Sequence, residues 1–117
     1  MYAEVAELSD LPAGRQARRF LGAIMYFVYV ILSLRRNYIY VGLTSSVERR
    51  FEQHQVGKEA TTAPYRPFQL LLAEQYETRR EARRREKYLK SGIGKEWIKA
   101  HFGIKRPRGG TWYTRSA

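Results

Sequence analysis

The stretch of residues 26–42 constrains the fold most strongly. It contains two runs that are rich in aromatic and β-branched residues, which favour β-strands. Polar residues 35–37 separate the two runs, so the stretch predicts a β-hairpin. With a loop of even length, for example a two-residue turn in which Asn37 adopts a positive φ, Tyr29 and Tyr40 point to the same face of the sheet. We therefore expect two phenols to share one surface.

The composition points to a polyanionic partner. The chain has 117 residues, enough for one domain with a modest core. Lys and Arg number 22 against 11 Asp and Glu, a net charge of +11, so nucleic acid is the leading partner class, although other basic proteins share such a charge. The absence of cysteine excludes disulfides, thiolate zinc sites and a cysteine nucleophile, and two histidines argue against a multi-histidine metal site.

The domain is expected to occupy residues 25–103, between an N-terminal extension of residues 1–24 and a basic flexible tail of residues 104–117. An apolar run at residues 21–34 follows several arginines, which is also a feature of export signals. The run is only about 14 residues long and lacks a small-residue cleavage site, so it is better interpreted as a buried first strand. We expect a cytoplasmic protein without a membrane partner.

A helix is expected to follow the hairpin. Ser45, followed three residues later by Glu48, forms a capping-box pattern that places the helix start at about Ser46. Arg50 lies at the edge of the apolar stripe, whose members at helical spacing are Val47, Phe51 and His54. Two interpretations stay open: Arg50 and His54 are structural, with His54 half-buried in the core, or both belong to a site.

The remaining elements follow from turn and capping signals. Residues 57–67 are expected to form a loop and residues 68–76 a third strand buried on both faces. Thr78 and Glu81 form a second capping box, which opens a helix that ends at about residue 91 with Gly92 as its stop. A short last helix is expected over residues 94–101.

The helix after Thr78 places a carboxylate on its buried side. Ala82, Glu86 and Leu89 share one face at helical spacing, so Glu86 occupies a position that periodicity assigns to the core. An ionised carboxylate there needs a partner. Either a salt bridge to an arginine or a bound divalent cation would supply one.

These motifs together resemble a known family. Val28-Tyr29-Val30, followed eleven residues later by Tyr40-Val41-Gly42, resembles the two half-motifs of the GIY-YIG nuclease superfamily in a valine-substituted form. Arg50 and His54 match the family's helix, and residues 81–90 resemble the segment that carries its metal-binding glutamate, here Glu86. The chain is identified as a small single-domain bacterial member, similar to the N-terminal catalytic domain of the excinuclease incision subunit. It departs from that subunit at Leu43, where the subunit has a lysine.

The resemblance implies an α/β sandwich, with a three-stranded antiparallel sheet flanked by helices, and a metal-dependent endonuclease that hydrolyses phosphodiester bonds of DNA. Structure selectivity and a role in DNA repair or recombination are further expectations. Glu86 would hold one Mg²⁺ or Mn²⁺ ion, and Arg50 would bind the phosphate. Tyr29 would position or deprotonate the attacking water with help from Tyr40, and His54 is the alternative base. Gly42 would allow a close approach of backbone or substrate.

Two rival functions use the same residues. A nucleic-acid-binding module could keep the fold without turnover, and a nuclease subunit could require a protein partner that supplies substrate recognition. In each case basic side chains would contact the phosphate backbone. The candidates are Arg49, Arg83, Lys87 and Lys90.

Overall fold

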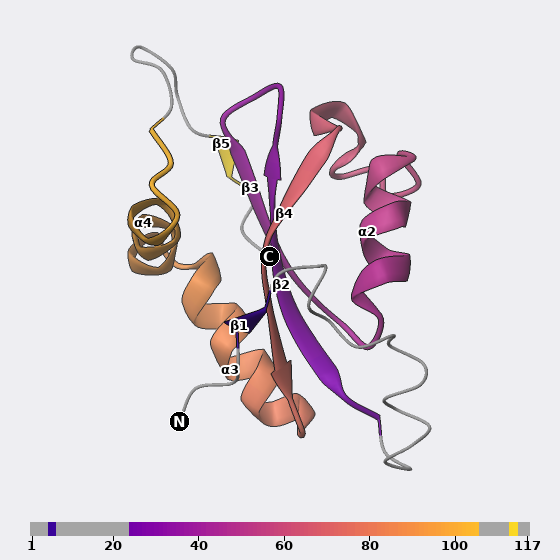
Figure 1. Ribbon diagram of the computed structural model, residues 1–117, viewed down its shortest axis with the longest axis vertical. Helices are drawn as coiled ribbons and strands as arrows, with labels where there is room; N and C mark the ends of the chain where they lie inside the picture. The colour runs from indigo at the N-terminus through magenta and orange to yellow at the C-terminus, as the bar shows by residue number, and fades with distance from the viewer. Residues whose placement is uncertain (1–4, 7–23, 106–112, 115–117) are drawn as a thin grey trace.

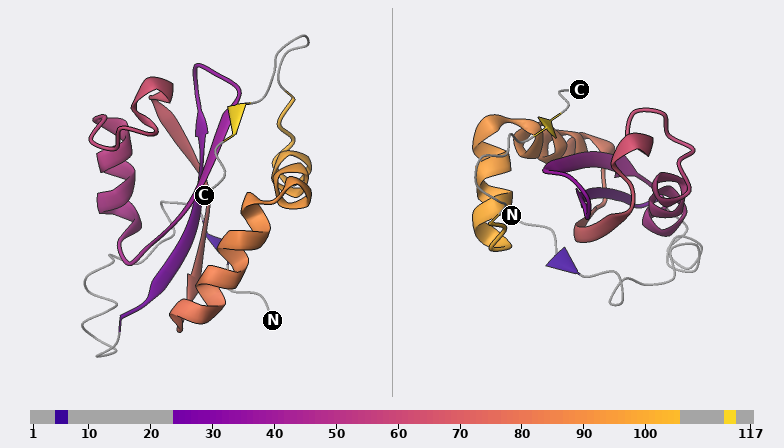
Figure 2. Two further views of the ribbon diagram at one scale, coloured as in Figure 1. Left: turned by 180° about the vertical axis from the view of Figure 1, so that it is seen from behind. Right: turned by 90° about the horizontal axis from the view of Figure 1, so that it is seen from above.

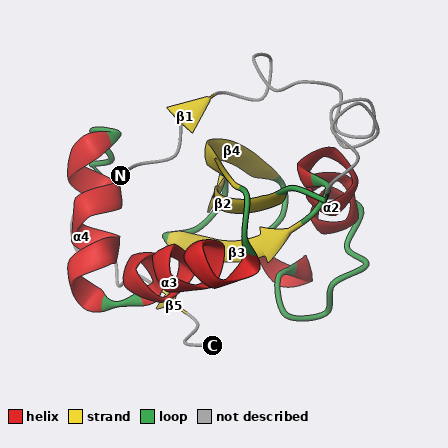
Figure 3. Cartoon of the chain, turned by 90° about the horizontal axis from the view of Figure 1, so that it is seen from below, coloured by secondary structure: helices red, strands yellow, loops and turns green. Residues whose placement is uncertain are grey.

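The computed structural model describes residues 5–6, 24–105 and 113–114. A central sheet lies between helix α2 (Val47–Gln55) on one face and helices α3 (Arg79–Lys90) and α4 (Gly92–His101) on the other (Figures 1 and 2). Figure 3 shows the same three layers from one end of the sheet. The expected α/β sandwich is therefore confirmed.

Three long antiparallel strands form the sheet: β2 (Tyr26–Ser33) lies in the middle, between β3 (Tyr38–Thr44) and β4 (Phe68–Tyr76). The two-residue strands β1 (Val5–Ala6) and β5 (Tyr113–Thr114) extend it, in the order β1-β4-β2-β3-β5. Strand β1 is antiparallel to β4, and β5 is parallel to β3. Most of the expected N-terminal extension and basic tail lies outside the described residues.

The hairpin register places the two tyrosines as expected. Tyr29 pairs with Gly42, and Ile31 pairs with Tyr40, so both phenols project from the same face. The predicted two-residue turn is wrong, because four residues connect the strands and no described residue other than glycine has a positive φ. The Ser33 hydroxyl shapes this connection by accepting hydrogen bonds from the backbone N–H groups of Arg35 and Arg36, at 3.1 and 3.0 Å.

The first capping prediction is wrong in detail. Helix α2 begins at Val47, close to the expected residue, but its N-cap Ser46 makes no side-chain capping bond. The Thr44 hydroxyl instead accepts a hydrogen bond from the Ser46 backbone N–H at 3.1 Å. Thr44, one residue before the predicted Ser45, therefore stabilises the turn into the helix. The local signal gave the correct helix start through a different set of contacts.

The second capping prediction holds at Thr78, whose hydroxyl accepts a hydrogen bond from the Glu81 backbone N–H at 3.2 Å. Gly92 does not stop the helix as expected. Ser91 ends α3 and also caps α4, because its hydroxyl accepts a hydrogen bond from the Gly94 backbone N–H at 3.1 Å. A short 3-10 turn, η2 (Ala63–Tyr65), interrupts the expected loop over residues 57–67.

Two apolar clusters fill the space on either side of the sheet. Alternate residues of β2 divide between them, with Val28 and Val30 facing α3 and α4 while Tyr29 and Ile31 face α2. Because β2 is buried on both faces, any polar atom on it must find a partner inside the protein. No helix within the described part of the chain is long and apolar enough to cross a bilayer.

Candidate active site

Two tyrosines and a histidine meet between the sheet and α2. The Tyr29 hydroxyl lies 2.8 Å from Nε2 of His54, and the ring centroid of Tyr40 lies 5.0 Å from that of His54. The two tyrosine rings are 6.2 Å apart. Tyr29 and His54 are almost fully buried, at 1% and 0% exposed, whereas Tyr40 is partly exposed. Strands β2 and β3 and helix α2 thus each contribute one side chain to a single cluster.

Gly42 makes this cluster possible. A Cβ atom at position 42 would lie only 2.5 Å from the Tyr29 hydroxyl oxygen and 2.6 Å from its Cζ atom. The close approach expected at Gly42 is therefore an approach by the Tyr29 ring, which lies over the glycine of its paired strand. Any larger side chain would displace the phenol from His54.

Burial controls the ionisation of the cluster. It raises the pKa of the Tyr29 phenol well above its usual value, and the neighbouring Tyr40 adds to that shift. Burial, reinforced by the positive charge of Arg50, lowers the pKa of His54 to about 4. Both groups are therefore neutral at pH 7. Tyr40 is the phenol of the pair that reaches the surface.

Arg50 extends from α2 beside the cluster. Its Nη2 atom donates to Oε1 of Glu59 at 2.9 Å and its Nη1 atom to Oε1 of Gln53 at 2.8 Å. A guanidinium has five N–H donors in a planar fork, so these two bonds orient it without using all of its donors. It is partly exposed and suited to a phosphate contact.

Two further residues of this site lie in a segment that sequence analysis treated only as a loop. Glu59 contacts Arg50, and the Thr62 hydroxyl lies 2.8 Å from Nδ1 of His54. Thr62 is fully buried. Loop residues show no periodicity, so nothing in the sequence pattern distinguished these two from their neighbours.

Glu86 lies on the opposite face of the sheet. It is almost fully buried, as its helical position predicted, and each carboxylate oxygen has a cationic partner. Oε1 is 3.0 Å from Nη1 of Arg83, and Oε2 is 3.0 Å from Nζ of Lys90. The salt-bridge interpretation of this carboxylate is therefore confirmed.

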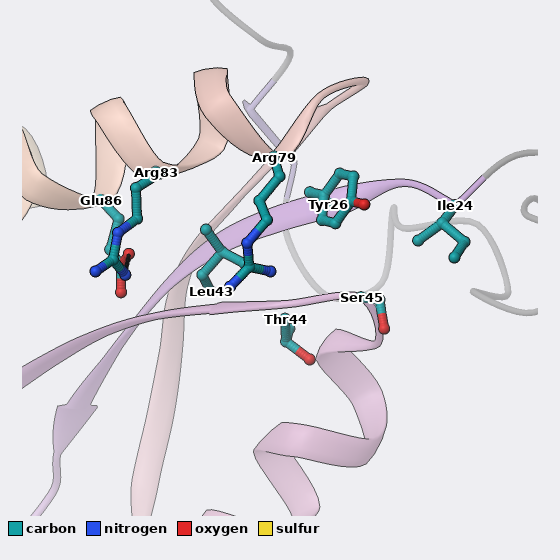
Figure 4. Close-up of a pocket in the computed structure, with 8 residues that line it drawn as sticks. All are labelled: Ile24, Tyr26, Leu43, Thr44, Ser45, Arg79, Arg83 and Glu86. Carbon is teal, nitrogen blue, oxygen red and sulfur yellow. Dashed lines mark hydrogen bonds and ion pairs between the residues drawn. The ribbon is translucent and has the colours of Figure 1, made fainter.

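Glu86 also lines a pocket of about 350 Å³ between α3 and the end of β3. Figure 4 shows Arg79, Arg83 and Glu86 extending from α3 toward the strand that carries Leu43. The other lining residues are Ile24, Tyr26, Thr44 and Ser45. Because Leu43 directly follows Gly42, one short segment of β3 borders both the Tyr29 cluster and the Glu86 pocket.

Glu86 gives this pocket the carboxylate oxygens that a hard cation prefers, whereas Arg79 and Arg83 in the same lining are themselves cationic. Mg²⁺ and Mn²⁺ prefer oxygen ligands, and Mg²⁺ commonly binds through one or two carboxylates while keeping several waters. Glu86 offers one carboxylate in a polar pocket with three hydroxyl-bearing residues in its lining, Tyr26, Thr44 and Ser45. No group of three or more His, Cys, Asp or Glu occurs among the described residues. An ion here would thus have one carboxylate ligand and would compete with Arg83 and Lys90.

The predicted nucleic-acid-binding residues do not form one group. Arg49 lies exposed on α2, while Arg83 and Lys87 lie exposed on α3, across the sheet. Lys90 is partly buried against Glu86. Arg49 thus lies on one side of the sheet, and Arg83, Lys87 and Lys90 lie on the other.

Sequence analysis also overlooked a buried ion pair on the α3 face. Glu74 of β4 is fully buried, and its two oxygens accept hydrogen bonds from Nε and Nη2 of Arg85 at 2.9 and 3.1 Å. Tyr76 donates a third bond to this carboxylate at 3.0 Å. The guanidinium also lies 5.0 Å from the ring centroid of Trp97. These contacts join β4, α3 and α4.

A model of the GIY-YIG catalytic domain matches residues 25–99. The chain belongs to the GIY-YIG family. It is 40% identical over 62 residues to UPF0213 protein RBAM_000440 of Bacillus velezensis, an alignment that covers 52% of this chain and 62% of that relative. It is 38% identical over 66 residues to UPF0213 protein YazA of Bacillus subtilis, covering 56% and 66%.

A third GIY-YIG relative, UPF0213 protein SH2523 of Staphylococcus haemolyticus, is 36% identical over 67 residues, which cover 56% of this chain and 80% of that protein. The chain thus spans slightly less than two thirds of the two Bacillus relatives. No solved structure matched the chain. The small GIY-YIG family of these relatives agrees with the small single-domain type that the motifs indicated.

Proposed function

We propose that this GIY-YIG protein is a metal-dependent endonuclease that hydrolyses phosphodiester bonds of DNA. The observation that carries the proposal is the meeting of Tyr29, Tyr40, Arg50 and His54 between the sheet and α2, since these residues come from three separate elements. A nuclease needs such a group to order a water and contact a phosphate. The net charge of +11 suits a polyanionic substrate.

In the proposed reaction Arg50 contacts the scissile phosphate. Glu59 and Gln53 hold the guanidinium from one side, which leaves other N–H donors for the non-bridging oxygens. Charge that develops on those oxygens during in-line attack would be stabilised by a donor that is already oriented. Arg50 therefore lowers the barrier without a large rearrangement.

The phenols order the attacking water. Tyr40 is partly exposed and can contact a water directly, whereas Tyr29 is buried and its hydroxyl contacts Nε2 of His54. Burial raises the pKa of the Tyr29 phenol well above its usual value, so at neutral pH Tyr29 contacts its neighbours through hydrogen bonds as a neutral phenol. Tyr29, Tyr40 and His54 all remain candidates for the general base, and their exposure favours Tyr40 as the one in contact with the water.

Glu86 would hold the Mg²⁺ or Mn²⁺ ion in this scheme. Bound there, such an ion supplies Lewis-acid stabilisation of the phosphate and lowers the pKa of a bound water. Glu86 lines the same pocket as Leu43, Thr44 and Ser45, which directly follow Gly42 in the chain. In the described part of the chain, β3 pairs with β5 only at Tyr38 and Ile39, so the strand beyond Ile39 forms an edge. A substrate strand across that edge would reach both faces of the sheet.

The basic residues on both faces would extend this contact. Arg49 on the α2 side, together with Arg83, Lys87 and Lys90 on the α3 side, would bind flanking phosphates without reading sequence. We infer a preference for branched or flapped DNA, because a substrate that bends around an edge can reach Arg49 and Arg50 on one face and the basic residues of α3 on the other, which a straight duplex cannot. A role in DNA repair or recombination would follow from that preference.

One observation favours the second candidate, a nucleic-acid-binding module without turnover. Both oxygens of Glu86 already have cationic partners, so this carboxylate has a structural role that needs no metal. A subunit whose activity requires a protein partner agrees with the same observation, since a partner could rearrange these ion pairs.

The test compares cleavage by the parent protein and by Glu86→Gln. Labelled branched, flapped, single-stranded and duplex DNAs are incubated with Mg²⁺, with Mn²⁺ and with EDTA. We expect metal-dependent cuts that fall at least a hundredfold in Glu86→Gln while binding persists. The matched control is Glu96→Gln, because the Glu96 carboxylate is 74% exposed on the neighbouring helix and should be dispensable. Salt-sensitive binding without cuts, in any metal, would favour the binding module.

A further inference from the structure

The turn over residues 59–62 contacts two of the site's side chains at once. Its backbone is closed by hydrogen bonds from the N–H groups of Thr62 and Ala63 to the Glu59 carbonyl oxygen, at 3.1 and 2.9 Å. The Glu59 carboxylate accepts from Arg50 at 2.9 Å, and the Thr62 hydroxyl lies 2.8 Å from Nδ1 of His54. One hydrogen-bonded turn thus contacts both of the site residues that α2 carries.

The hydrogen bonds determine where the His54 proton lies. A neutral imidazole has one N–H and one bare nitrogen, and its partners decide which is which. Nε2 faces the Tyr29 hydroxyl, and the charged group that faces this phenol from α2 is the guanidinium of Arg50, which has no lone pair to offer. The Tyr29 proton therefore needs Nε2 as its acceptor, and the His54 proton must be on Nδ1.

Thr62 continues this series of hydrogen bonds, with each donor pointing the same way. Its hydroxyl lies 3.5 Å from the Glu59 carbonyl oxygen, so it can donate there while accepting from Nδ1 of His54. The order is Tyr29 to His54, His54 to Thr62, and Thr62 to the Glu59 backbone. With its proton directed inward, the Tyr29 oxygen turns its lone pairs toward Arg50 and the site.

We propose that Thr62 is a positioning residue, which fixes the Nδ1–H tautomer of His54 and thereby makes Tyr29 a hydrogen-bond acceptor toward the site. Thr62 touches no substrate in this scheme and acts through His54. The inference rests on the proposed nuclease function for its kinetic consequence, but the tautomer is a property of the free protein. The two can therefore be tested separately.

The test uses Thr62→Val, which keeps the shape and removes the hydroxyl. The control is Thr61→Val, the same change one residue earlier at a half-exposed position. Nitrogen-15 NMR of the imidazole reports the tautomer, because a bare ring nitrogen resonates far from a protonated one. We expect the parent and Thr61→Val to show bare Nε2 and protonated Nδ1, and Thr62→Val to show a mixture or the reverse.

Cleavage kinetics and pH profiles give the second readout. We expect Thr62→Val to lower kcat about ten- to a hundredfold with KM nearly unchanged, as for other groups that orient a functional histidine. Thr62→Ser should restore both kcat and the NMR pattern, which a purely structural role for the methyl group would not allow. The charged and titratable groups around His54, which would also affect a pH profile of cleavage, are Arg50, Glu59, Tyr29 and Tyr40.

The outcomes separate the inference from the function. Bare Nδ1 and protonated Nε2 in the parent would overturn the inference whether or not the protein cleaves DNA. An active enzyme whose Thr62→Val variant keeps the parent's kcat would overturn the positioning role and leave the nuclease intact. Absence of cleavage together with the expected tautomer would count against the nuclease alone.

Discussion

Replacing Gly42 by alanine tests the packing that holds the site together. The added Cβ atom would lie 2.5 Å from the Tyr29 hydroxyl oxygen, 2.6 Å from Cζ and 2.7 Å from Cε1. Tyr29 is 1% exposed, so its ring has no open space into which to move. Overpacking of this kind costs about 1–3 kcal/mol, and loss of the hydrogen bond to His54 adds about 1 kcal/mol. We therefore expect Gly42→Ala to lower the free energy of unfolding by about 2–4 kcal/mol.

The assay is thermal and urea unfolding of Gly42→Ala, with Gly92→Ala as the control. A Cβ atom on Gly92 would meet nothing within 4 Å, so that variant should melt at or slightly above the parent's Tm. For Gly42→Ala we expect Tm to fall by about 10 °C or more, since 1 kcal/mol corresponds to about 4–8 °C in a domain of this size. In a Tyr29→Phe background only the overpacking part of the cost, about 1–3 kcal/mol, should persist, because Cζ and Cε1 remain while the hydrogen bond to His54 is already absent. A Gly42→Ala protein that melts within about 2 °C of the parent would refute the packing argument.

Two other predictions follow from buried charges. Because the pKa of His54 falls from its ordinary 6.5 to about 4 on folding, protonation favours the unfolded state. Neutral His54 should therefore contribute about 3 kcal/mol to the free energy of unfolding above pH 6.5, and this contribution should be lost as the pH falls to 4. Urea titrations of the parent and of His54→Gln at several pH values would show it as the difference between the two proteins. Glu74→Ala should cost about 3–5 kcal/mol by removing a buried carboxylate that accepts two hydrogen bonds from Arg85, against less than about 1 kcal/mol for Glu96→Ala on the surface. Equal effects of the two glutamate variants would contradict the burial argument.

The hairpin could be predicted because its information is local. Alternation along β2 and β3 decides which side chains share a face, so the common surface of Tyr29 and Tyr40 followed from the sequence once the loop length was even. The turn itself could not be predicted in detail. It depends on the Ser33 hydroxyl, which accepts from two backbone N–H groups and so stabilises a four-residue connection without a positive φ. Side-chain contacts to backbone of this kind have no periodic signal.

Among the charged and polar residues of the interior, some positions could also be predicted from the sequence and others could not. Helical spacing located Glu86 correctly, because three positions on one face are enough to identify the buried side. Glu74 had an available signal that went unused, since it shares a strand face with buried Leu72 by simple alternation. Glu59 and Thr62 had none. Their contacts to Arg50 and His54 arise from a turn that only the folded chain brings against α2.

The Tyr29 cluster and the Glu86 pocket lie on opposite faces of the sheet, and neighbouring residues of β3, Gly42 and Leu43, contact one each. On the α2 face Gly42 admits the Tyr29 ring, which fixes the phenol against His54. On the α3 face the next residue, Leu43, borders the pocket of Glu86. A side chain at position 42 would clash with the Tyr29 ring. In the proposed nuclease the two faces act on one phosphate, so Gly42→Ala should lower cleavage by more than its loss of stability accounts for at temperatures where the variant remains folded.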